Sequence, residues 1–137
     1  MSGRAPIVEF RSDDDDETLL LLSYHAADPD MGALEVEVRS SGLTCTESAL
    51  SLGGDGLDVF LAGLAADWRG WEGVRRWDTL EMEIGLEATH QGHRVKLLFI
   101  VRRDYEQDSW ELRLPILVAP GESLSRLAVG TAGLFGR

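Results

Sequence analysis

Residues 81–102 read EMEIGLEATHQGHRVKLLFIVR, two runs of alternating apolar and polar residues that meet at Gln91-Gly92. A two-residue turn there predicts a β-hairpin. Its apolar face pairs Ala88 with Val95, Leu86 with Leu97, Ile84 with Phe99, and Met82 with Val101. The same register sets Glu87 opposite Lys96 and Glu81 opposite Arg102. Apolar packing and charge therefore select the same antiparallel alignment.

A further strand and a helix are expected after this hairpin. From Trp110 to Val118 every second residue is apolar, and Pro115 predicts an edge or a strand end. Residues 103–108 form the connecting loop. After Pro120-Gly121 the spacing becomes helical, with Ser123 as a candidate cap. The predicted buried face of this terminal helix contains Leu124, Leu127, Ala128, Leu134 and Phe135.

The first third of the chain reads as four strands. They are expected at Ile7–Arg11, Thr18–Tyr24, Leu34–Arg39 and Leu43–Leu52. Strict alternation of apolar and charged residues in the third strand is typical of a half-buried strand. In the fourth strand the apolar phase shifts along the segment, which predicts a bulge or bend.

A central helix is expected next. Its apolar stripe recurs at helical spacing through Leu57, Phe60, Leu61, Leu64 and Trp68. Asp55 is placed to cap the helix through a backbone N–H of its first turn, and Gly70 should end it. Trp68 continues the stripe and is expected in the core.

Together these elements predict an α+β fold. We expect about seven strands in an antiparallel β-sheet or sandwich, with one central and one C-terminal helix packed on it. Residues 1–137 contain no internal repeat of 20 to 50 residues and no Pro-rich or Gly/Ser linker, which favours a single domain.

Composition limits the classes of function. Hydrophobic residues make up 44% and charged residues 27% of the chain, which is typical of a soluble globular domain. The single cysteine, Cys45, and the lack of a signal-peptide pattern predict a cytoplasmic protein. The net charge of −11 disfavours binding to nucleic acids and to anionic membranes, and favours a basic protein as partner.

Patterns that could carry catalysis or metal binding are better explained as plain structure. The acidic run from Asp13 to Glu17 lacks a calcium-loop pattern and reads as a solvated loop. His90 and His93 flank the hairpin turn but lack an evident third metal ligand. Cys45 has no catalytic signature around it and reads as a small apolar strand residue. Residues 53–56 lack phosphate-loop spacing and read as a turn and helix cap. We therefore assign no metal, no cofactor and no catalytic residue.

The segment from Trp68 to Trp77 contains three of the four tryptophans of the chain. One interpretation is structural, with Trp71 and Trp77 burying large rings against the sheet. The other is an exposed binding site, because tryptophan and arginine dominate binding hot spots. The candidate partner-binding residues are Arg69, Trp71, Arg75, Arg76 and Trp77.

The same segment carries a resemblance. Gly54-Asp55-Gly56-Leu57, a short helix, and Asp67-Trp68-Arg69-Gly70-Trp71-Glu72-Gly73 resemble the marker stretch of a family of small uncharacterised bacterial proteins. That family is in turn loosely similar to the WapI-type immunity proteins, cytoplasmic single-domain antagonists of toxins. The resemblance implies binding rather than catalysis.

Three hypotheses about function follow. The first is a non-catalytic protein-binding domain, such as an immunity protein that covers the active surface of a basic toxin with acidic groups. The second is a small-ligand binding module with a pocket between the sheet and the tryptophan-rich loop. The third is a hydrolase or isomerase whose site is assembled from residues distant in the sequence. The sequence does not predict the oligomeric state.

Overall fold

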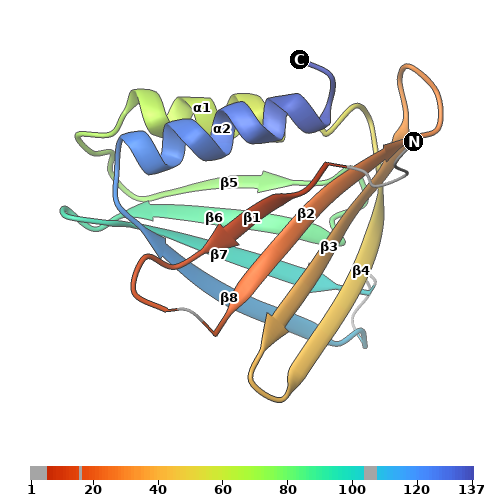
Figure 1. Ribbon diagram of the computed structural model, residues 1–137, viewed down its shortest axis with the longest axis horizontal. Coiled ribbons are helices and arrows are strands. Elements are labelled where there is room, and N and C mark those ends of the chain that lie inside the picture. The colour runs from red at the N-terminus through yellow and green to blue at the C-terminus, as the bar shows by residue number, and fades with distance from the viewer. Residues whose placement is uncertain (1–5, 16, 104–107) are drawn as a thin grey trace.

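The chain folds into two antiparallel sheets and two helices in the computed structural model, which describes residues 6–15, 17–103 and 108–137 (Figure 1). Within these residues each sheet has four strands, in the orders β1-β2-β3-β4 and β5-β6-β7-β8. The first half contains β1 (Val8–Arg11), β2 (Leu19–Ala26), β3 (Gly32–Ser40), β4 (Leu43–Ser51) and α1 (Leu57–Ala66). The second half contains β5 (Val74–Asp78), β6 (Ile84–His90), β7 (Val95–Arg102), β8 (Glu111–Val118) and α2 (Glu122–Leu134).

The two halves follow the same plan, a meander of four strands followed by one helix. Strands β2 to β4 cross β5 to β8 at a steep angle, and α1 and α2 lie side by side across one end of the sheets (Figure 1). The sequence expectation of an α+β fold with antiparallel sheet is confirmed, and the arrangement is the two-sheet form of that expectation.

One continuous core fills the space between the sheets and the helices. The two sheets meet through Phe10 and Phe99, whose rings are 5.0 Å apart and pack edge to face. Leu61 and Leu64 of α1 are buried, as their helical spacing predicts. The other core residues come mainly from the strands, because every second side chain of a strand points to the same face of its sheet.

The count of about seven strands omitted β5. This strand lies inside the tryptophan-rich segment, where the sequence pattern predicts a loop. Arg75 and Arg76 interrupt the apolar pattern there, and Trp77 is the one side chain of β5 that is buried. A five-residue edge strand with a single buried residue gives too short a period-2 signal to detect.

The predicted register of the β6–β7 hairpin is wrong by two residues. The structure pairs Ala88 with Leu97, and His90 with Val95. Residues 91–94 form the connection, where the Gln91 N–H donates to the Arg94 carbonyl at 2.8 Å. A shift of two residues keeps every side chain on its expected face, because the side-chain period of a strand is two. The prediction of the apolar face is therefore correct, but the predicted charge pairs are wrong.

Those charges find other partners. Glu87 lies opposite Leu98 and pairs with Arg76 of β5 at 2.7 Å. Arg102 pairs with Glu111 of β8 at 3.0 Å, rather than with Glu81. These two ion pairs thus join β5 to β6 and β7 to β8, rather than the two strands of the hairpin.

Local predictions at the ends of the helices also need correction. Helix α1 begins after Gly56, whose φ is 77°, and the Asp55 carboxylate accepts a hydrogen bond from the Leu52 N–H at 3.3 Å instead of capping the helix. Helix α2 begins at Glu122, so that Ser123 lies inside its first turn. No bulge divides β3 and β4 in the described residues, since they pair without interruption from Gly32–Ser51 to Ser40–Leu43.

The acidic run after β1 ties one corner of the two sheets together. The Asp13 N–H donates to the Leu117 carbonyl at 2.9 Å, and the Leu117 N–H donates to the Ser12 hydroxyl at 2.8 Å. The Ala119 N–H donates to the Asp13 carboxylate at 2.7 Å. Asp16 and residues 104–107 of the expected loops lie outside the described residues.

Candidate functional site

The tryptophan loop comprises residues 67–75, which connect α1 to β5 and include the first two residues of that strand. Trp68 is 48% exposed, and the Arg69 guanidinium lies over its ring at 5.1 Å. Trp71 is half-buried, with the Arg75 guanidinium 4.9 Å above its ring. Arg75 also forms an ion pair with Asp67 at 2.8 Å. The loop therefore presents two stacked pairs of tryptophan and arginine.

His90 fastens this loop to the β6–β7 hairpin. Its Nε2 lies 2.8 Å from the Trp68 carbonyl, and its Nδ1 accepts the Gly92 N–H at 3.1 Å. Since a carbonyl can only accept, Nε2 carries the proton in this arrangement. The His90 ring also packs edge to face on Trp71 at 5.2 Å. These contacts join the loop to the hairpin and occupy both ring nitrogens of His90.

Trp71 and Trp77 anchor the loop through hydrogen bonds from their indole N–H groups to backbone carbonyls. The Trp71 indole N–H donates to the Ala88 carbonyl at 3.3 Å. Trp77 is 7% exposed, and its indole N–H donates to the Asp55 carbonyl at 2.9 Å. Trp77 is therefore a core residue, whereas Trp71 is a half-buried anchor of the loop.

The five predicted site residues do not form one surface. Arg69, Trp71 and Arg75 lie in the tryptophan loop. Trp77 is buried, and Arg76 points to the opposite face of its strand, as alternation requires. Sequence reasoning missed Trp68, which it placed in the core. Helix α1 ends at Ala66, two residues before Trp68, so the helical spacing no longer applies to it. A pattern extended past the end of its element caused the error.

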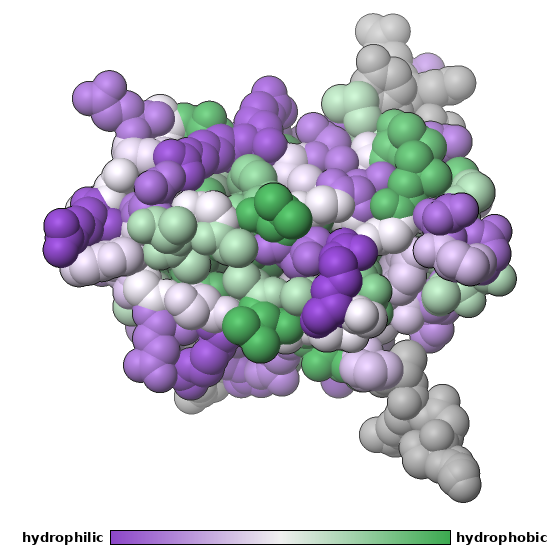
Figure 2. Space-filling model, turned by 90° about the horizontal axis from the view of Figure 1, so that it is seen from above, coloured by the Kyte–Doolittle hydropathy of each residue, from purple (hydrophilic) through white to green (hydrophobic). Residues whose placement is uncertain are grey.

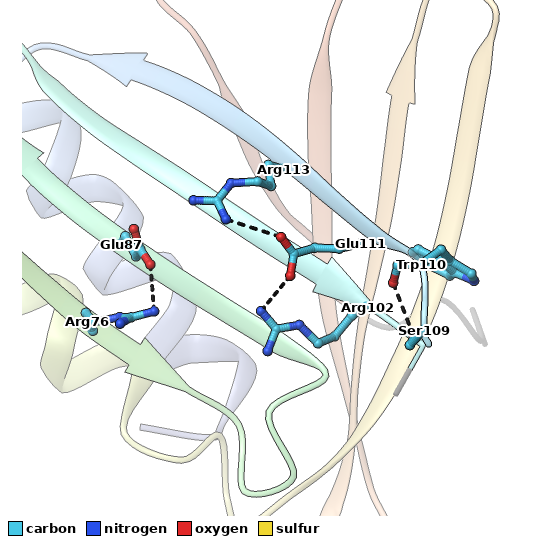
Figure 3. A network of polar contacts seen from close by, with 7 residues as sticks. All are labelled: Arg76, Glu87, Arg102, Ser109, Trp110, Glu111 and Arg113. Carbon is cyan, nitrogen blue, oxygen red and sulfur yellow. Dashed lines mark hydrogen bonds and ion pairs between the residues drawn. The ribbon is translucent and has the colours of Figure 1, made fainter. Parts of the chain in front are cut away.

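Arg76 belongs to a polar network on the outer face of β5 to β8 (Figure 3). It pairs with Glu87, while Glu111 accepts from Arg102 at 3.0 Å and from Arg113 at 3.2 Å. Burial raises the pKa of the neighbouring Asp78 carboxyl, although the Arg76 and Arg102 charges lower it. The mixed signs of this network neutralise one another, so the face carries no strong charge of either sign.

Other groups that could carry chemistry are dispersed. Burial, assisted by the Glu47 charge, raises the pKa of the Cys45 thiol, so this thiol is poorly ionised at neutral pH. Among the described residues, no group of three or more His, Cys, Asp or Glu side chains is arranged to hold a metal ion.

An open groove of about 320 Å³ lies between β1 and α2, on another part of the molecule than the tryptophan loop. Its lining contains Glu9, Arg11, Asp13, Val118, Ser123, Arg126 and Leu127. Its lining includes both acidic and basic side chains, and Arg11 pairs with Glu9 at 2.7 Å. This groove does not coincide with the pocket that the sequence reading expected between the sheet and the tryptophan loop.

The helix layer offers a second exposed surface. Val59 of α1 and Val129 of α2 are both exposed, and Figure 2, which looks onto this layer, shows apolar patches separated by polar side chains. Within the part of the chain that the structure describes, neither helix is long and apolar enough to cross a membrane. The tryptophan loop, by contrast, gathers two aromatic rings and two guanidinium groups in one place.

Comparison with known proteins gives one match. No curated protein and no solved structure matches the chain. A family model covers residues 10–137, from the middle of β1 to the end of the chain, and therefore includes nearly all of the fold and the whole tryptophan loop. The chain belongs to this family, the family of unknown function DUF6228.

Proposed function

We propose that this chain is a non-catalytic protein-binding domain that uses the tryptophan loop to hold a basic protein in the cytoplasm. If the partner is a toxin, the domain acts as its immunity protein. The observation that carries the proposal is the exposed Trp68 ring, stacked by Arg69 and fixed through its carbonyl to His90. An exposed tryptophan whose backbone is already hydrogen-bonded has less conformational freedom to lose when a partner covers it, and tryptophans contribute strongly to binding hot spots.

The charge of the chain supports a basic partner. A net charge of −11 attracts a cationic protein over long range and speeds its association, while the tryptophan loop supplies the close contacts. Salt should therefore slow association, and truncation of the loop should speed dissociation.

The experiment is capture of the partner from a native lysate at low salt, followed by calorimetry with the purified pair. We expect a stoichiometric complex that dissociates as salt is raised. Trp68→Ala should weaken binding by about 30-fold, the effect of losing a hot spot of about 2 kcal/mol. Val59→Ala, at an exposed site on α1, is the matched control and should leave the affinity unchanged. Recovery of the chain alone, or equal affinities for the two variants, would contradict the proposal.

A further inference from the structure

The two sheets have four edges, and three of them are blocked in ways that proteins commonly use against strand addition. β8 has Pro115, which has no N–H to offer, and its Leu117 backbone is occupied by Ser12 and Asp13. β1 has only four residues, and β5 has only five, two of them arginines. Short strands and charged side chains both discourage pairing with another chain.

The fourth edge, β4, is neither short nor interrupted by proline, and its one charged residue is Glu47. It runs for nine residues, Leu43–Ser51, and contains neither proline nor lysine. Its pairing with β3 is regular from end to end, so no bulge twists the edge away. Among the described residues β4 pairs with β3 alone. Figure 1 shows it at the margin of its sheet, on the other side of the molecule from the loop between α1 and β5.

The turn between β3 and β4 identifies the open backbone groups. Ser40 and Leu43 flank a two-residue turn and are partners in the ladder, so their backbones bond to each other. Hydrogen-bonded and non-hydrogen-bonded pairs alternate along an antiparallel ladder. The residues whose N–H and carbonyl groups point away from β3 are therefore Thr44, Thr46, Ser48 and Leu50, and all of them are exposed.

One contact supports this assignment independently. The Ser48 N–H, which should point to the open side, donates to the neighbouring Glu47 carboxylate at 3.4 Å. An N–H within the ladder would be bonded to β3 instead. This long, local hydrogen bond is one that an incoming strand can readily replace.

The charges along the edge indicate what the incoming strand carries. Glu47 lies on β4, and Glu35 lies opposite Ser48 on β3. Neither carboxylate has an ion-pair partner among the described residues, whereas the adjacent Glu37 is paired with Arg39. A second copy of the chain would bring the same unpaired carboxylates, and another net charge of −11, to this edge. A basic segment would pair with them.

We propose that β4 accepts an extended, basic segment of a partner protein as a fifth strand of its sheet, with two adjacent basic residues near Glu47 and Ser48. Backbone hydrogen bonds to Thr44, Thr46, Ser48 and Leu50 supply affinity, and Glu35 and Glu47 select the charge. This edge is separate from the tryptophan loop, so the inference goes beyond the proposed function and does not rest on it.

The probe is an acetylated and amidated peptide, Thr-Val-Thr-Lys-Arg-Thr-Val-Thr, titrated into the ¹⁵N-labelled full chain to roughly 1 mM, the weak end of specific binding. We expect saturable shifts at the four outward amides that exceed those of Cys45, Glu47 and Ala49. The same peptide methylated at alternate backbone nitrogens should give no such shifts, because it cannot donate to the edge. A peptide with two glutamates in place of Lys-Arg should bind at least about tenfold more weakly.

Two variants complete the test. Thr46→Pro removes one outward N–H, for which the described part of the chain shows no partner, and should abolish the shifts. Thr46→Val keeps the N–H and should retain them. Trp68→Ala should also retain them, which separates this surface from the tryptophan loop. The proposal is overturned if the outward amides do not respond, if the methylated or acidic peptide binds equally well, or if sedimentation shows a dimer of the free chain that Thr46→Pro dissociates. The peptide comparison uses the unaltered chain and remains decisive if Thr46→Pro does not fold.

Discussion

At the scale of single residues, the Asp58 carboxylate is 8% exposed and is held by Arg137, whose Nε and Nη2 lie 3.0 and 2.9 Å from its oxygens. We expect Arg137→Ala to lower the free energy of unfolding by about 1–3 kcal/mol, because it leaves a buried carboxylate without its cation. Half of the Arg137 side chain is exposed, so water moderates this loss. The measurement is denaturant unfolding.

The matched control for this prediction is Arg126→Ala. Arg126 pairs with Glu122 at 3.7 Å on the exposed side of α2, where both side chains are largely solvated. Such i, i+4 pairs contribute less than about 0.5 kcal/mol. Equal losses for Arg126→Ala and Arg137→Ala would show that burial of Asp58 adds nothing.

The same pair predicts a dependence on pH. The hydrogen bond between Asp58 and Arg137, reinforced by the Arg137 charge, holds the pKa of Asp58 below its usual range. Burial acts in the opposite direction and raises this pKa. The unfolded chain titrates near the ordinary aspartate pKa of about 3.9, so the stabilisation is present above that pH and disappears as pH falls through the lower pKa of the folded chain. We expect the stability gap between the unaltered chain and Asp58→Asn to be constant near neutral pH and to shrink below about pH 4. Urea unfolding at a series of pH values measures the gap, and a gap that widens in acid would contradict the assignment.

The exposed Trp68 and the buried Trp77 give a second comparison of single residues. Trp77→Phe removes the hydrogen bond to the Asp55 carbonyl and leaves a small void in the core, so we expect a loss of about 1–3 kcal/mol. Trp68→Phe changes an exposed ring and should stay within about 0.5 kcal/mol. Thermal unfolding of both variants checks the order, which would be reversed if Trp68 were the buried ring.

At the scale of elements, the turn between β4 and α1 packs against the end of α2. A Cβ added to Gly54 would lie 2.3 Å from the Phe135 ring, and its φ of +94° also disfavours a side chain. We expect Gly54→Ala to cost more than about 2 kcal/mol. Gly53→Ala, with a φ of +64° and open space around the new Cβ, should cost only the backbone strain of about 1–2 kcal/mol. Equal losses in denaturant unfolding would argue against close packing of Phe135.

Elements with many alternating residues were predicted well, and their alignment was predicted less well. The apolar faces of β6 and β7 follow from the sequence because burial imposes a period of two on eight or so residues. The register depends on the turn, where His90 accepts the Gly92 N–H and Gln91 bonds to Arg94, and such side-chain contacts are not encoded in a hydrophobic pattern. β5 was not predicted because its strand conformation depends on hydrogen bonding to β6 more than on the pattern of its own residues.

At the scale of the whole molecule, the rings of Phe10 and Phe99 join the two sheets. We expect Phe99→Ala to lower the free energy of unfolding by about 3–5 kcal/mol through the cavity that it leaves. Leu98→Ala, on the outer face of the same strand, should cost about 1 kcal/mol. A double-mutant cycle with Phe10→Leu and Phe99→Leu should give a coupling energy of about 0.5–1.5 kcal/mol. A coupling energy of zero would mean that the sheets do not meet through these rings.

The position of the candidate site depends in part on this scale, and its role as a binding site stays a prediction. Composition alone singled out the segment from Trp68 to Trp77, and the structure brings Trp71 and Arg75 together there. The role of His90 could not be predicted, since it depends on the β6–β7 hairpin reaching back to the loop between α1 and β5. Contacts between segments so far apart in the sequence follow from the packing of the two halves and leave no local pattern.

The repeated order of four strands and one helix has a consequence for assembly. Each half completes its own sheet, and the residues between α1 and β5 are the only covalent link from one half to the other. If that link were too short to turn back, each half would have to find its counterpart on a neighbouring molecule, producing an intertwined dimer by domain swapping. The length of this hinge therefore determines whether one polypeptide can close its own interior.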